Sequence, residues 1–146
     1  MAAPRLDPSP FNRSAAGPAH LYAHVGLQTG VSGASPHQLV TMLFDGYADA
    51  VATAKAALGH GQIALKCQAI GRALRIIDEG LKACLDLSGG GALAADLSAL
   101  YAFVTLRLTQ ANLRNDDAAL DECLALVQPL REAWASIAPQ VDAGRA

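Results

Sequence analysis

Four stretches of this chain repeat apolar residues at intervals of three and four positions, between Leu39 and Ile137. That interval places the apolar side chains on one face of an α-helix. Short connections near residues 59–62, 88–91 and 115–117 separate the stretches. Consecutive helices with short connections pack antiparallel. We therefore predict an all-α fold, an antiparallel four-helix bundle with an N-terminal capping segment.

The first predicted helix begins after Ser35. Ser35 and Gln38 have the spacing of a capping box, and Pro36 occupies the first helical position, where proline is favoured. The sequence 59–61 (Gly-His-Gly) ends this helix. Its predicted inner face is Leu39, Leu43, Tyr47, Val51, Ala54 and Leu58.

The second predicted helix has the most regular spacing, with alternating steps of four and three that resemble a coiled-coil seam. Gly71 and Gly80 weaken this helix intrinsically but allow another backbone to approach closely. The sequence 88–91 (Ser-Gly-Gly-Gly) predicts a turn. The seam residues are Ile63, Cys67, Ile70, Leu74, Ile77, Leu81 and Cys84.

The third and fourth predicted helices are separated by the sequence 115–117 (Asn-Asp-Asp), which offers a cap for the fourth. The inner face of the third helix is Leu93, Leu97, Leu100, Val104, Leu108 and Ala111. That of the fourth is Leu120, Cys123, Val127, Leu130, Trp134 and Ile137.

The chain divides by composition into four parts. Residues 1–19 contain four prolines among small and polar residues and predict a flexible tail. Residues 20–34 are partly apolar and predict the capping segment, whereas residues 35–139 form the predicted bundle. Residues 140–146 predict a second flexible tail.

Composition and charge exclude several classes of function. A net charge of −2 gives no basic surface for nucleic acid. We expect no membrane insertion, because no stretch reads as long and apolar enough to span a bilayer. Three cysteines without a signal peptide favour reduced thiols in a cytoplasmic protein.

No catalytic or metal-binding constellation is visible, so we expect no enzyme activity, cofactor or metal. The histidines lack Cys, Glu or His partners at ligand spacing on one helix, and we interpret them as surface or capping residues. Cys67, Cys84 and Cys123 lie on inner seams and predict buried thiols. We expect Lys66, with Arg72, Arg75 and Lys82, to form a solvated basic face.

The helices carry more apolar residues than one small bundle can bury, and such a surplus usually serves to bind another chain. The residues outside the seams include Phe44, Ile76, Phe103, Leu106 and Leu124. These residues could instead complete a broader core, since a globular helix often buries a wide stripe. The alternatives stay open at this point.

In order and spacing, the motifs resemble the FliS family of flagellar export chaperones for flagellin over about residues 21–139. The matching stretches are 22–25 (YAHV), 32–40 (SGASPHQLV), 42–46 (MLFDG), 73–81 (ALRIIDEGL), 97–101 (LSALY), 107–116 (RLTQANLRND) and 132–134 (EAW). The resemblance implies an antiparallel four-helix bundle with an N-terminal segment packed against it. It also implies a cytoplasmic chaperone, with no catalytic site or cofactor, that binds the C-terminal region of flagellin, prevents premature polymerisation and assists type III secretion.

From the family motifs and the off-seam residues together, we expect the partner-binding residues to be Tyr22, Val25, Phe44, Asp45, Ile76, Phe103, Leu106, Asn112 and Leu124. The resemblance further implies contacts with the flagellar export apparatus and, in some relatives, with an anti-sigma factor. It leaves open whether the free chain forms a weak homodimer. Two alternatives remain, a small helical enzyme and a self-assembling structural subunit without a flagellin client.

Overall fold

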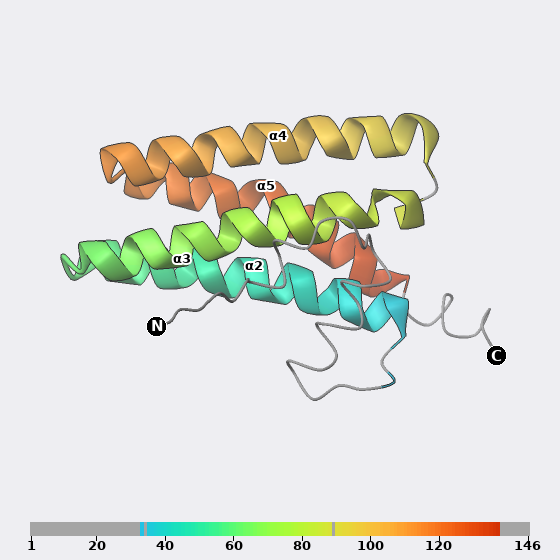
Figure 1. Ribbon diagram of the computed structural model, residues 1–146, viewed down its shortest axis with the longest axis horizontal. Helices are drawn as coiled ribbons and strands as arrows, with labels where there is room; N and C mark the ends of the chain where they lie inside the picture. The colour runs from blue at the N-terminus through green and yellow to red at the C-terminus, as the bar shows by residue number, and fades with distance from the viewer. Residues whose placement is uncertain (1–32, 34, 89, 138–146) are drawn as a thin grey trace, which may run out of the picture.

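The computed structural model describes residues 33, 35–88 and 90–137 of the chain, and it contains an antiparallel four-helix bundle (Figure 1). Helix α2 spans Pro36–Gly59, α4 spans Gly91–Arg114 and α5 spans Asp117–Ser136. The second arm consists of α3 (Ile63–Arg75), a π-helical segment η3 (Ile76–Leu81) and a 3-10 segment η4 (Lys82–Ser88). The predicted tails 1–19 and 140–146 and almost all of the predicted capping segment lie outside the described residues.

Local sequence signals explain where the helices begin and end. The Ser35 hydroxyl accepts a hydrogen bond from the Gln38 backbone N–H, and the Gln38 side chain accepts one from the Ser35 N–H, which confirms the predicted capping box. The Asp116 carboxylate accepts a hydrogen bond from the Ala119 N–H and caps α5 as predicted. Asn115 ends α4 in the left-handed conformation, at φ 50°.

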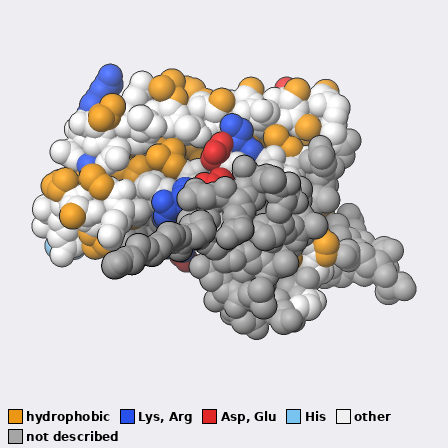
Figure 2. Space-filling model, in the orientation of Figure 1, with side chains coloured by type: hydrophobic (Ala, Val, Ile, Leu, Met, Phe, Trp, Pro, Cys, Tyr) orange, Lys and Arg blue, Asp and Glu red, His pale blue; other side chains and the backbone are white. Residues whose placement is uncertain are grey.

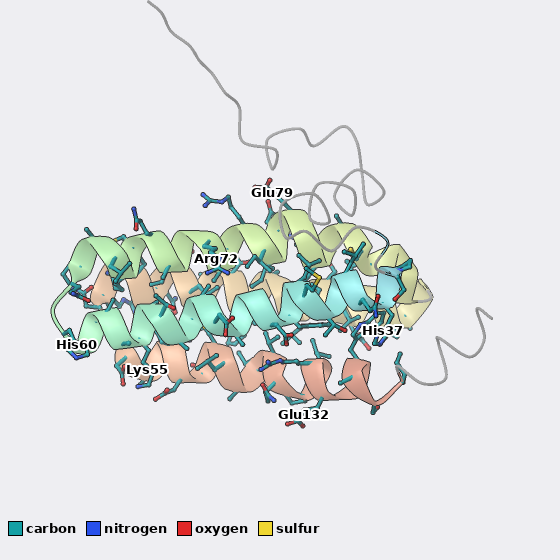
Figure 3. The ribbon with its side chains drawn as sticks, turned by 90° about the horizontal axis from the view of Figure 1, so that it is seen from below. His37, Lys55, His60, Arg72, Glu79 and Glu132 are labelled. Atoms are coloured by element: carbon teal, nitrogen blue, oxygen red, sulfur yellow. The ribbon has the colours of Figure 1, made fainter. Side chains whose placement is uncertain are left out.

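The helices surround one core. Helix α2 packs against α3 on one side and α5 on the other, while α4 packs against α5 and the second arm (Figures 1 and 3). The buried apolar residues come from all four arms, and many are alanines. A Tyr47 hydroxyl that donates to the Cys123 carbonyl oxygen at 2.9 Å joins α2 to α5 inside this core.

The buried face of the second arm differs from the predicted seam. Ile63 is 44% exposed and Cys67 is also exposed, so the predicted burial of both is wrong. The buried positions run instead through Lys66, Ala69, Ile70, Ala73, Ile76, Ile77, Gly80, Leu81 and Cys84. Alanine and glycine on this face let the second arm approach α2 closely. A Cβ on Gly80 would lie only 2.9 Å from a methyl group of Leu43, so Gly80 makes room for a side chain of α2 and not for a backbone. A Cβ on Gly71 would meet no described atom within 4 Å, so the predicted close approach of another backbone there is wrong.

Two polar residues that we expected at the surface are buried. Lys66 is 1% exposed because its ammonium group donates hydrogen bonds to the backbone oxygen of Asn112, at 2.8 Å, and to the side-chain oxygen of Asn115. These bonds compensate the cost of burying the amine. His37 is 5% exposed, because its ring stacks on Trp134.

Candidate partner-binding groove

An apolar groove opens at the end of the bundle where α2 begins, α4 begins and α5 ends. Its volume is about 310 Å³. Each helical arm contributes to its wall, which is formed by Val40, Phe44, Leu81, Cys84, Leu93, Leu97, Tyr101, Leu130, Ala133, Trp134 and Ile137. Most of these residues were predicted to lie in a closed core. The sequence pattern therefore predicted that they face inward, but it did not predict the opening between them.

The groove is open because the first half of α4 is poorly covered. The first ten residues of α4 include no fully buried side chain, whereas Tyr101, Val104, Leu108 and Ala111 in the rest of the helix are buried. Leu93 is 54% exposed, so its predicted place in a closed core is wrong. Among the described residues, no side chain caps the start of α4, at Gly90. This part of α4 therefore presents an apolar face with room beside it.

Helix α4 is also long and apolar enough, by length and composition, to cross a membrane. The prediction that no stretch meets this criterion is therefore wrong, because α4 is rich in alanine and leucine and only a small part of it is buried. Polar contacts nevertheless join α4 to the bundle, since Arg107 pairs with Glu122 of α5 at 2.8 Å.

At one rim of the groove, two aromatic side chains, His37 of α2 and Trp134 of α5, stack on each other. The rings of His37 and Trp134 stack with centroids 4.7 Å apart and planes 6° apart. The Trp134 indole N–H donates to the His37 carbonyl oxygen at 3.0 Å, and the His37 Nε2–H donates to the Trp134 carbonyl oxygen at 2.8 Å. These bonds fix the orientation of Trp134, so this wall of the groove is preformed.

The floor of the groove is buried and offers little acid–base chemistry near neutral pH. Burial, with a smaller effect of nearby Cys84, raises the pKa of Tyr101 to about 12. Within the described residues, no three His, Cys, Asp or Glu side chains lie together as a metal-binding group. The arrangement suits the binding of apolar side chains.

The predicted partner-binding residues do not form one site. Tyr22 and Val25 lie outside the described residues, and Phe44 is the one predicted residue that lines the groove. Phe103 (43% exposed) and Leu106 (52% exposed) lie on the surface of α4. Their role in binding stays a prediction.

The other four predicted residues lie elsewhere on the bundle. Asp45 forms an ion pair with Arg131 at 2.8 Å. Ile76 is buried beside Gly46 of α2, and Leu124 borders two shallow hollows between α2 and α5. The buried Oδ1 of Asn112 has no hydrogen-bond partner among the described residues.

Sequence reasoning missed the groove residues Leu97, Leu130 and Trp134 as contact candidates because they fall on predicted inner seams. One signal was available. The inner positions of this end are mostly large, whereas those at the other end include Ala54 and Ala111. Large side chains on facing helices keep the backbones further apart than alanines do.

Comparison with known proteins gives a consistent result. The family model described as "Flagellar protein FliS" matches residues 18–141. The chain is 46% identical to the flagellar secretion chaperone FliS of Salmonella typhimurium over 121 residues, which are 83% of this chain and 90% of the relative. It is 37% identical to that of Vibrio cholerae, over 82% of this chain and 87% of the relative. Identity to the Bacillus subtilis chaperone is 31%, over 73% of this chain and 78% of the relative.

Proposed function

Since the chain belongs to the FliS family of flagellar secretion chaperones, we propose that its client is flagellin, whose C-terminal region it binds in the cytosol. Binding would prevent premature polymerisation and present the subunit to the flagellar type III export apparatus. The observation that carries this proposal is the open apolar groove of about 310 Å³ between α2, α4 and α5. A chaperone family is not an enzyme class, and we propose no catalytic role.

The size and lining of the groove fit an amphipathic segment. A cavity of roughly 150 Å³ holds one benzene ring, so this groove has room for about two large apolar side chains. Burying apolar area contributes about 25 cal/mol per Å². Ordering a flexible client costs on the order of 2–5 kcal/mol, so tight but reversible binding needs further contacts outside the groove.

Flagellin is a suitable client on physical grounds. Its terminal segments must be apolar and amphipathic, because they pair with other copies in the filament. A chaperone that binds them has to cover this apolar face without a folded partner, and wrapping a flexible segment over a large surface achieves this. Phe103 and Leu106 are exposed on α4 and can extend the contact beyond the groove.

We also propose that residues 20–31 cover the client surface before flagellin arrives, with Tyr22 and Val25 as the contacting residues. This proposal is supported by the position of Tyr22 and Val25, which are apolar residues that lie before the four helices in the sequence and belong to none of them. Flagellin affinity and self-association are compared between the full chain and a chain lacking residues 1–31. If neither quantity changes, this covering role is excluded.

A groove substitution tests the proposed function. Leu93→Glu places a charge at a 54% exposed groove position, so the fold should persist, as circular dichroism can verify. We expect calorimetric titration with the flagellin C-terminal segment to show at least about a tenfold loss of affinity, or ~1.4 kcal/mol. The matched control is Ile63→Glu, since Ile63 is 44% exposed but lies at the other end of the bundle.

Two results would reject this assignment. Equal affinities for the two variants would remove the groove from the binding site. Homo-oligomers that ignore the flagellin segment would favour the alternative of a self-assembling structural subunit. A 1:1 complex that is sensitive to Leu93→Glu alone supports the chaperone.

A further inference from the structure

Two shallow hollows between α2 and α5 form a second surface, which shares no lining residue with the groove. The two helices lie side by side in Figure 3. The hollows have an apolar floor, formed by Ala48, Ala52 and Ala56 of α2 and Leu124 and Ala125 of α5. Ala52, Ala56 and Ala125 are exposed, so no described element covers this floor. We call this surface the α2–α5 face.

Negative charge predominates around the α2–α5 face. Four carboxylates and two basic side chains lie at or beside the hollows: Asp45, Asp49, Asp117, Asp121, Lys55 and Arg131. Lys55 is shared between Asp117, at 2.8 Å, and Asp121, at 3.4 Å. Asp49 is exposed and forms no ion pair with any described residue. The face therefore suits a segment that combines apolar side chains with positive charge.

The opposite side of the bundle differs in its charges. Helices α3 and α4 form that side, because α2 and α5 each pack against one of them. Figure 2 shows this side, where basic and acidic side chains are scattered among apolar ones. It serves as the reference surface for the experiments below.

The first 17 residues of the chain have the matching composition. They precede the family match, which begins at residue 18, and they lie outside the described residues. They carry Arg5 and Arg13 against the single acid Asp7, together with the apolar Leu6 and Phe11. Three prolines restrict the backbone of this tail. Binding it therefore costs less conformational entropy than binding an average segment.

The length of the chain allows the tail to reach the α2–α5 face. Ala52 lies 16 residues beyond Pro36, the first residue of α2, or about 24 Å along the helix at 1.5 Å per residue. Arg13 precedes Pro36 by 23 residues, which span up to about 76 Å when extended. The tether also keeps the tail at a local concentration in the millimolar range. A contact too weak to persist between separate molecules is then populated.

We propose that residues 1–17 bind the α2–α5 face of the same molecule. The leucine and phenylalanine of the tail contact the alanine floor, and its two arginines lie beside the carboxylates of Asp49 and Asp121. While bound, the tail shields this apolar surface from other chains. The proposal does not depend on flagellin as the client.

A spin label on the full chain tests the contact. Ser9→Cys in a Cys67→Ser background labels the tail alone, since the other two cysteines are buried. In NMR spectra, the label should broaden the amide signals of Ala52 and Leu124 more than that of Ala99 on α4. No broadening, or equal broadening on every side of the bundle, overturns the proposal.

Charge reversal tests the arginine contacts on the same labelled chain. Asp49→Lys combined with Asp121→Lys should reduce the broadening about threefold at low salt, because two attractions become repulsions. Adding Arg5→Glu and Arg13→Glu should restore most of it. The matched control is Asp96→Lys, an exposed carboxylate of α4, which should leave the broadening unchanged. No loss in the first variant, no recovery in the second, or an equal loss in the control overturns the proposal.

A mixed sample tests whether the tail binds its own molecule. A spin-labelled chain without isotope is mixed, in the micromolar range, with an isotope-labelled chain that carries no spin label. We expect no broadening between the two. Broadening of the Ala52 and Leu124 signals in this mixture would mean that the tail binds a second copy, which overturns the proposal.

Discussion

The two ends of the bundle have similar spacings of apolar residues but differ in how completely those residues are buried. At the closed end, where α2 meets α3 and α4 meets α5, Val51, Leu108 and Leu120 are all 0% exposed. At the open end, Leu93 is 54% exposed and Trp134 is partly exposed beside the groove. Regular spacing of apolar residues therefore specifies a helix face but does not specify whether that face is closed by its own chain.

Side-chain size and capping account for the difference. Ala54, Ala111 and Ala119 at the closed end are 0% exposed and permit close packing of the helices. Lys66 links the last turn of α4 to α3 there, and Figure 1 shows that short connections join α2 to α3 and α4 to α5 at this end. At the open end, large side chains face one another, and no side chain in the described part of the chain caps the start of α4. The closed end stabilises the fold while the open end remains available for binding.

Core truncation should give the largest contrast between the two ends. Leu108→Ala removes a fully buried side chain and should lower the free energy of unfolding by about 3 kcal/mol, within the usual range of roughly 2–5. Leu93→Ala in the groove should cost less than about 1 kcal/mol, because that side chain is already exposed. Urea denaturation measures both. Similar losses would contradict the distinction between closed and open ends.

The buried lysine should give the next largest effect. Lys66→Met keeps the apolar stem but leaves the Asn112 carbonyl and the Asn115 side chain without their donor. We expect a loss of about 2 kcal/mol in urea denaturation, the cost of unpaired buried polar groups. The control is Lys82→Met, which removes an exposed pair with Asp78 and should cost less than about 0.5 kcal/mol. Equal losses of unfolding free energy in the two variants would show that the hydrogen bonds of Lys66 do not stabilise the fold.

A smaller effect should appear at alkaline pH on the groove floor. Burial raises the pKa of Tyr101 from 10.0 to about 12, so the neutral phenol stabilises the folded state fully below pH 10. This contribution is lost as the pH rises from 10 through 12. By pH 11 the loss of folding free energy is about 1.4 kcal/mol. Between pH 8 and pH 11, the free energy of unfolding of Tyr101→Phe should therefore fall by about 1.4 kcal/mol less than that of the parent chain. Urea denaturation at each pH measures both.

The control for this prediction lies at the closed end. Burial raises the pKa of the Cys123 thiol from 9.0 to about 12, so the Tyr101→Phe protein should still lose stability above pH 9. Cys123→Ala should reduce that remaining loss, and burial of Tyr47, which also raises the pKa of its phenol, should account for the rest above pH 10. A pH profile of Tyr101→Phe that runs parallel to the parent would mean that the phenol ionises equally in the folded and unfolded states.

Local signals in the sequence predicted most of the fold. The caps at Ser35 and Asp116 depend on residues three positions apart, so each is readable without tertiary information. Local signals did not predict which residues of the second arm are buried. Lys66 appears solvated in sequence, and only the fold brings the Asn112 carbonyl to it from 46 residues away.

The candidate site was less predictable than the fold. Phe44 was expected as a contact, but the groove also depends on Leu97, Leu130 and Trp134, whose spacing indicated a closed core. Whether such a face closes depends on the combined size of the side chains from all the facing helices, which the spacing of apolar residues along one helix does not encode. The stacking of His37 on Trp134 likewise joins residues 97 positions apart.

Hydrogen exchange with and without the flagellin C-terminal segment tests the central claim most directly, namely that the open end of the bundle takes the client. Binding should slow amide exchange in the first half of α4 and the last half of α5, which border the groove. The buried helix segments around Val51 and Leu120 should show little local change. Protection confined to the closed end, with none along the groove, would contradict the account.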